Sequence, residues 1–141
     1  AKQKNVFNII KFVGAITNEK VYQYYRAADI FFSLYDLSNV GNPLLEAIRE
    51  HKVIFTLSNG DTGKWISHKK NGFIYNPVDK NTISSIVNDL YNIIIDSSLK
   101  KNIEENVRIL EREKLWTWEQ RMNAEVEEVL KIISLEKRNG N

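Results

Sequence analysis

The sequence predicts an α/β fold with a Rossmann-like parallel sheet. Short, dense apolar runs alternate with segments of helical spacing over the first half of the chain, and the last part is helical. Strands that are joined through a helix pair in parallel, so this alternation predicts about four strands, flanking helices and two or three C-terminal helices. The 141 residues, 43% of them hydrophobic and 27% charged, suit one compact domain.

Four apolar runs carry the strand predictions. Each is short and rich in β-branched and aromatic residues. In chain order they are residues 6–13 (closed by Gly14), 30–35, 52–57 and 73–75.

Helices are predicted between and after these runs. Thr17 or Asn18 can cap a helix that reaches Ala28, and Asn42-Pro43 predicts a helix to about Glu50, since a capping side chain precedes a ring fixed at helical φ. Thr117-x-x-Gln120 matches a capping box. Apolar stripes continue the helical pattern at Ile83, Ile86, Val87, Leu90 and Ile94; at Leu99, Ile103, Val107 and Leu110; and at Trp118, Met122, Val126, Val129 and Ile133.

Composition excludes several classes of function. Twenty basic and 18 acidic residues leave a net charge of +2, too small a margin to indicate nucleic acid as a partner. The absence of cysteine excludes disulfides, thiolate nucleophiles and cysteine-based metal sites, and it fits a cytoplasmic location. Two histidines, His51 and His68, are too few and too far apart to predict a metal centre.

The loops that follow the strands are the predicted binding region, because parallel sheets bind ligands beyond the carboxyl ends of their strands. Gly14-Ala15-Ile16, Tyr35 to Asn42 and Ser58 to Gly63 qualify. In the middle loop, Gly41 permits close backbone approach, and the helix start at Asn42-Pro43 favours a phosphate. Glu46, one turn into that helix, can accept hydrogen bonds from ribose hydroxyls. The alternative is that Gly41 only makes the turn and Glu46 only complements the helix dipole.

Two further segments have weaker chemical signals. Gly60-Asp61-Thr62-Gly63-Lys64 has the wrong glycine spacing for a phosphate-cradling loop and is better explained as a polar turn. His68-Lys69-Lys70 is interpreted as a solvated basic turn rather than a lipid or phosphate contact.

A set of motifs in a fixed order resembles a known family. The chain resembles the C-terminal, donor-binding domain of retaining glycosyltransferases of group 1, which have the two-domain GT-B fold. The motifs that carry the resemblance are Phe12-Val13-Gly14, Tyr24 to Phe32, Gly41 to Ala47, Lys52-Val53-Ile54, Asn71 to Pro77 and Trp116-Thr117-Trp118-Glu119.

The resemblance implies a nucleotide-diphosphate sugar as the donor substrate, without a cofactor or metal. It implies that Glu46 bonds the ribose hydroxyls, that backbone N–H groups around Asn42, Leu44 and Leu45 face the diphosphate, and that Gly14 and Ala15 meet the base. The family has a further glutamate at the position of Ser38. The sugar contacts are therefore expected from Ser38, Asn39 or Asn42.

The resemblance also implies that residues 1–135 form part of such a domain, with residues 136–141 as a polar tail. The domain's upstream half and the acceptor-binding N-terminal domain have no counterpart in the sequence, and the expected partners include these parts. The remaining sheet edge is a candidate for self-association. The preferred hypothesis is that the chain is a segment of a glycosyltransferase and is inactive alone. Membrane contact is expected only for the longer protein. The alternatives are a non-catalytic partner that keeps the fold and an unrelated flavodoxin-like binding module.

Overall fold

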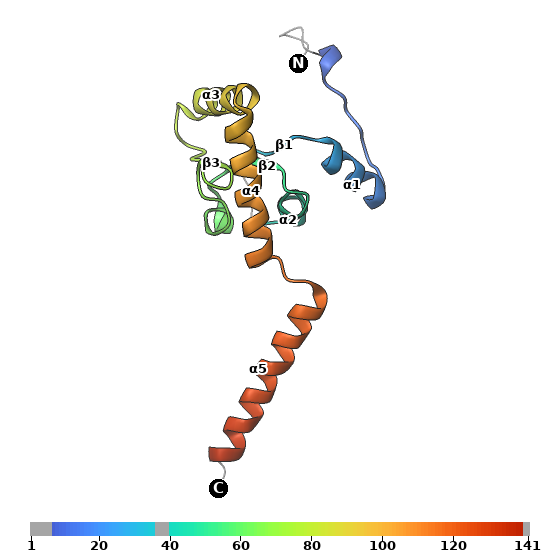
Figure 1. The fold of residues 1–141 in the computed structure, drawn as a ribbon, viewed down its shortest axis with the longest axis vertical. Helices are drawn as coiled ribbons and strands as arrows, with labels where there is room; N and C mark the ends of the chain where they lie inside the picture. Colours follow the sequence, from blue (N-terminus) through green and yellow to red (C-terminus); the bar gives the residue numbers. More distant parts are fainter. Residues whose placement is uncertain (1–6, 36–39, 140–141) are drawn as a thin grey trace.

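The computed structural model describes residues 7–35 and 40–139, and it has α/β architecture (Figure 1). Three parallel strands form the sheet in the order β1 (Ile30–Ser33), β2 (Val53–Leu57) and β3 (Phe73–Tyr75). The helices are α1 (Asn18–Ala27), α2 (Asn42–Arg49), α3 (Thr82–Ile95), α4 (Ser97–Lys114) and α5 (Trp118–Asn139), with 3₁₀ turns η2 (Phe7–Ile9) and η3 (Gly60–Lys64). Three of the four predicted strands and all the predicted long helices are therefore confirmed.

The core is built around β2, whose five residues are all buried. Its central residue, Phe55, is opposite Phe32 of β1 and Phe73 of β3, and the ring centroids lie 4.9 and 4.5 Å away. Helices α2 and α4 pack on β2 and on each other. The buried hydrophobic residues of the helices are Leu44, Ala47 and Ile48 of α2, Ile93 of α3, and Ile103, Val107 and Leu110 of α4.

The strand predicted for residues 6–13 is wrong over the residues that the structure describes. Phe7–Ile9 form the 3₁₀ turn η2, and residues 10–13 join no strand ladder. Figure 1 shows this segment on the far side of α1 from the sheet. Because a strand is stabilised by pairing with a neighbour, an apolar run without an adjacent strand does not form one. Ile9 and Phe12 are consequently 79% and 76% exposed.

The inward face of α3 also differs from the prediction. Ile86 and Leu90 pack on the core as expected, but Ile93 rather than Ile94 is the buried residue, and Ile83 and Val87 are exposed. Asp89 is buried on this same face.

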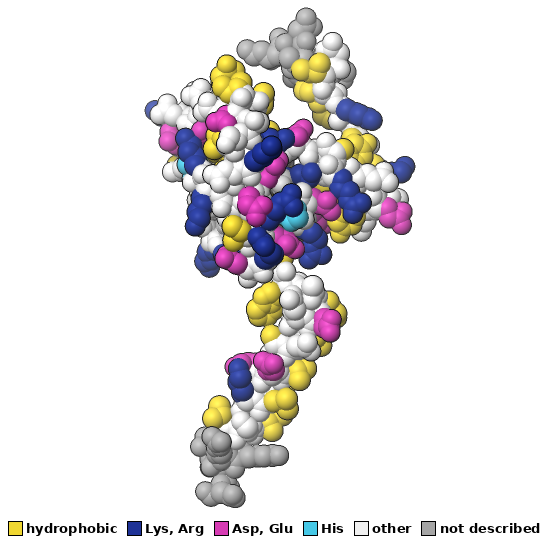
Figure 2. All heavy atoms as spheres, viewed as in Figure 1, with side chains coloured by type: hydrophobic (Ala, Val, Ile, Leu, Met, Phe, Trp, Pro, Cys, Tyr) yellow, Lys and Arg dark blue, Asp and Glu magenta, His cyan; other side chains and the backbone are white. Residues whose placement is uncertain are grey.

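Helix α5 begins as predicted and extends to Asn139. The Gln120 side chain accepts a hydrogen bond from Thr117 N–H at 2.8 Å, and Thr117 Oγ1 accepts one from Gln120 N–H at 3.2 Å, which confirms the capping box. The helix extends away from the body with its apolar side chains exposed (Figure 2). Among the described residues, no helix is both long and apolar enough to cross a membrane.

Candidate functional site

The predicted anion site at the start of α2 has a different cap from the one expected. Gly41, with φ −101° and ψ 169°, is the capping residue, and Asn42 is the first residue of the helix. The N–H groups of Leu44 and Leu45 both donate to Gly41 O, at 3.0 and 3.3 Å. Gly41 has the extended backbone conformation that a helix cap requires. The N–H groups of Leu44 and Leu45 are therefore already hydrogen-bonded within the first turn of the helix.

A surface cavity of about 280 Å³ lies along the outer face of α2. Leu44, Ala47 and Ile48 face the core, which leaves the opposite side of this helix to line the cavity. The lining residues come from α1, α2 and the connection between α4 and α5: Tyr22, Asn42, Leu45, Glu46, Arg49, Leu115 and Trp116. Three residues predicted to bind a donor are therefore brought together here.

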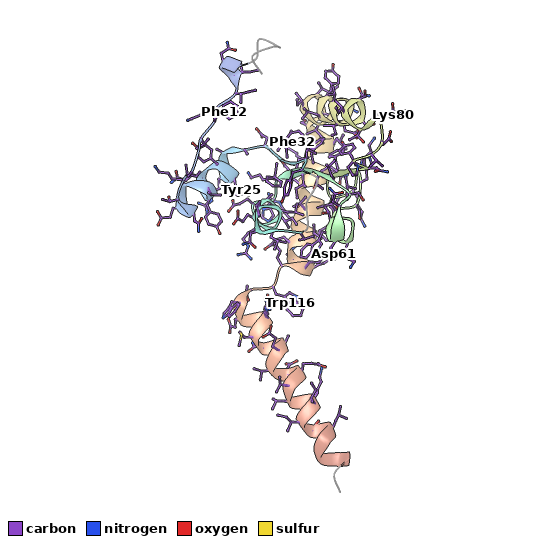
Figure 3. All side chains as sticks on the ribbon, turned by 180° about the vertical axis from the view of Figure 1, so that it is seen from behind. Phe12, Tyr25, Phe32, Asp61, Lys80 and Trp116 are labelled. Atoms are coloured by element: carbon purple, nitrogen blue, oxygen red, sulfur yellow. The ribbon has the colours of Figure 1, made fainter. Side chains whose placement is uncertain are left out.

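Helix α1 is fixed beside this cavity through Tyr25. Its hydroxyl donates to Pro43 O at 3.0 Å, which joins α1 to the first turn of α2 (Figure 3). Burial, and then the negative charge of Glu46, raise the pKa of Tyr25 to about 12. The Tyr25 hydroxyl consequently remains a neutral donor near Glu46 at physiological pH.

Glu46 and Arg49 give the cavity both a hydrogen-bond acceptor and a positive charge. They are three residues apart on one helix and so share a face. Trp116, which is 56% exposed, adds an aromatic surface to the lining of the cavity. A carboxylate, a guanidinium and an aromatic ring are suited to a ligand with hydroxyls, negative charge and a planar or apolar ring.

The structure does not bring all the predicted site residues together. Gly14 and Ala15 lie in the segment that precedes α1, and both are exposed. Gly14 has φ +71°, and open space lies where its Cβ would be. Ser38 and Asn39 lie outside the described residues. Sequence reasoning missed Arg49, which its spacing from Glu46 could have indicated. It also missed Tyr22 and Trp116, which only the tertiary arrangement brings to α2.

Metal binding finds no support in the described part of the chain. No group of three or more His, Asp or Glu residues there has a geometry that could hold a metal ion.

The family comparison matches residues 1–110 to the model of the glycosyl transferases group 1 family. A search of curated proteins found no match.

The solved structures that resemble this chain include larger proteins. The C-terminal domain of the group 1 family glycosyl transferase LpcC from Francisella tularensis has a TM-score of 0.70 and 27% identity, over 80% of this chain and 57% of that one. Sucrose-phosphate synthase from Thermosynechococcus elongatus has a TM-score of 0.74 and 20% identity, over 93% and 33% of the two chains. HepE from Anabaena, in complex with UDP, has a TM-score of 0.69 and 20% identity, over 92% and 34%. The chain thus spans between a third and somewhat over a half of these proteins.

Proposed function

Since this chain belongs to the glycosyl transferases group 1 family, we propose that it is the donor-binding part of a retaining glycosyltransferase. Its substrate is a nucleotide-diphosphate sugar, from which the complete enzyme transfers the sugar to a glycan, lipid or polysaccharide acceptor. HepE, which shares the fold, was solved with UDP and with UDP-glucose. A uridine nucleotide is therefore the first donor to test.

The cavity along α2 is the observation that carries this proposal. Glu46 lies on the exposed face of α2 with Asn42 and Arg49. In the proposed complex, the Glu46 carboxylate accepts hydrogen bonds from the two ribose hydroxyls, which an anionic acceptor is well suited to bind. Arg49 provides positive charge for the diphosphate, and Trp116 packs against a ring of the nucleotide-diphosphate sugar.

Catalysis in this proposal comes from positioning and from charge stabilisation. Breaking the bond between the sugar and the diphosphate develops negative charge on the leaving phosphate. Positive charge that is already in place, here the Arg49 guanidinium, stabilises this developing charge more than it stabilises the ground state. The proposed partners are an acceptor-binding domain and strands that would pair with the side of β1 where the described residues place no strand. They belong either to the same polypeptide or to another.

Isothermal titration tests the proposal with UDP, GDP, ADP and their glucose or mannose conjugates. The titrations use this chain alone and, where it is part of a longer polypeptide, that polypeptide as well. We expect saturable binding of at least one diphosphate, weakened at least tenfold by Glu46→Ala, since a hydrogen bond to a charged group contributes about 1.5–3 kcal/mol. Glu127→Ala, an exposed glutamate change on α5, is the matched control and leaves affinity unchanged.

The absence of nucleotide binding by either protein, or equal binding by the Glu46→Ala protein, would contradict the proposal. A second candidate, a non-catalytic partner domain, is favoured by Ser38 at the position where the family has a glutamate. It predicts binding without transfer in the longer protein. Turnover that Glu46→Ala abolishes would exclude it.

A further inference from the structure

A second cavity, of about 340 Å³, lies at the carboxyl end of β3. Its lining includes His68 and Lys69 from the loop before β3, Tyr75 and Asn76 from the end of the strand, and Ser85 and Asp89 from α3. It shares no lining residue with the cavity along α2. The cavity along α2 is lined by α1, α2 and the connection between α4 and α5, so the two cavities are formed by different elements.

Asp89 is the most buried charged group of this cavity, at 6% exposure. Tyr75 OH donates to Asp89 Oδ2 at 3.0 Å, and Lys69 Nζ lies 2.9 Å from Oδ1. Burial and the Asp89 charge both raise the pKa of Tyr75, so its hydroxyl remains a donor. These two donors use about half of the acceptor capacity of a carboxylate, and the rest is available to a ligand.

His68 lies close to Asp89 without a direct hydrogen bond to it. Its Nδ1 accepts a hydrogen bond from Ile74 N–H at 3.3 Å, which places the proton of the neutral ring on Nε2. Nε2 is 3.8 Å from Asp89 Oδ2, beyond hydrogen-bond distance. A hydroxyl between these atoms can accept from Nε2–H and donate to Oδ2. A phosphate or ionised carboxylate only accepts and an ammonium only donates, so neither can make both bonds.

Lys69 holds a backbone conformation that is unfavourable for its residue type. Its φ of +60° lies in the left-handed region, which costs a residue with a Cβ free energy. The loop keeps this conformation through a hydrogen bond from Lys69 N–H to Gly72 O at 2.8 Å and through the ion pair with Asp89. Strain of this kind beside a cavity is a recognised starting point for a functional hypothesis.

The charge of the cavity argues for a neutral ligand. Asp79 and Asp89 outweigh Lys69 when His68 is neutral, which disfavours phosphates and sugar acids. Asn88 and Ser85 add an amide and a hydroxyl, groups that both donate and accept. We propose that this cavity binds a neutral saccharide unit, with one sugar hydroxyl bridging His68 Nε2 and Asp89 Oδ2. This inference does not rest on the proposed function, because nucleotide binding at Glu46 can fail while saccharide binding here succeeds.

Two-dimensional ¹⁵N NMR of the whole chain tests the proposal. The probes are the methyl glycosides of glucose, mannose and galactose, with glucuronic acid and glucose 6-phosphate as charged comparisons. We expect saturable shifts of the Ile74, Asn76 and Asn88 amides with a neutral glycoside, with a dissociation constant of about 1 mM, a weak affinity that suits a shallow polar site. The charged sugars should bind at least about tenfold more weakly.

Variants locate the bridging hydroxyl. His68→Phe keeps an aromatic ring but removes the Nε2 donor, and Asp89→Asn removes the negative charge; each is expected to weaken binding about tenfold or more. Asp61→Asn, an exposed aspartate change on η3, is the matched control and leaves binding unchanged. If Asp89→Asn does not fold, His68→Phe decides alone, since that side chain is already 41% exposed. The absence of saturable shifts, equal binding by His68→Phe, or equal affinity for glucose 6-phosphate would overturn the proposal.

Discussion

The hydrogen bond between Tyr75 and Asp89 makes a quantitative prediction about stability. Tyr75→Phe removes only the hydroxyl, and the ring keeps its position 6.2 Å from the centroid of Phe55. A hydrogen bond to a charged group contributes about 1.5–3 kcal/mol, and Asp89 keeps Lys69 as a partner. We therefore expect the free energy of unfolding to fall by about 2 kcal/mol, near the low end of this range.

Thermal and urea unfolding, followed by circular dichroism, measure this change. For a protein of about this size, 1 kcal/mol moves Tm by roughly 2–4 °C, so Tyr75→Phe should lower Tm by roughly 4–8 °C. The matched control is Tyr91→Phe on the same helix as Asp89, where the tyrosine is 61% exposed. This exposed change should remain within about 0.5 kcal/mol of the parent protein.

A double-mutant cycle with Asp89→Ala assigns the loss to the pair. If the hydroxyl acts through the carboxylate, Tyr75→Phe should cost much less in the Asp89→Ala background than in the parent protein. A Tyr75→Phe protein as stable as Tyr91→Phe, or the same cost in both backgrounds, would refute the reasoning.

Three further predictions concern other parts of the chain. Folding raises the pKa of Tyr25 from 10.0 to about 12, so the neutral hydroxyl stabilises the fold fully below pH 10, and this stabilisation is lost as pH rises through 12. In a pH series of unfolding curves, the free energy of unfolding should therefore fall less steeply above pH 10 for Tyr25→Phe than for the parent protein. Gly72→Ala should lower the free energy of unfolding, measured in urea, by about 3 kcal/mol. The added Cβ would lie 3.0 Å from Ile66 Cγ2 and 3.1 Å from Ile54 O, and the residue would have to keep φ +155°. Thr117→Ala should cost the start of α5 about 1 kcal/mol, seen as faster amide exchange in its first turn, while exchange in β2 stays unchanged.

The strands show where sequence patterns were sufficient for the fold and where they were not. Strands at residues 52–57 and 73–75 were predicted from composition and length, and β2 and β3 pair there as expected. Residues 6–13 have the same kind of composition but form no strand over their described part. The pattern reports the preference of a segment for extended backbone, whereas a strand also requires a neighbour at hydrogen-bonding distance.

The candidate donor site was predicted in its local parts only. The turn at Gly41 and the helix with Glu46 follow from adjacent residues, and the sequence located both. The predicted capping residue was Asn42, and the observed one is Gly41. Both residue types are acceptable caps, so the sequence alone does not distinguish them. Trp116 lines the same cavity from a position 70 residues beyond Glu46, and no local pattern connects the two.

Asp89 explains why the inward face of α3 could not be predicted. Three successive residues at the end of this helix, Ile93-Ile94-Ile95, are apolar, so hydrophobic spacing alone does not select which of them faces the core. Burying a carboxylate is unfavourable unless it is paired, so an aspartate in a helix does not by itself indicate a side that faces the core. Tyr75 and Lys69, both distant from Asp89 in sequence, provide the pairing, and with Asp89 turned inward Ile93 becomes the buried residue. The same pairing that orients α3 also forms the polar floor of the second cavity, so the packing of this helix and the proposed saccharide site depend on one carboxylate.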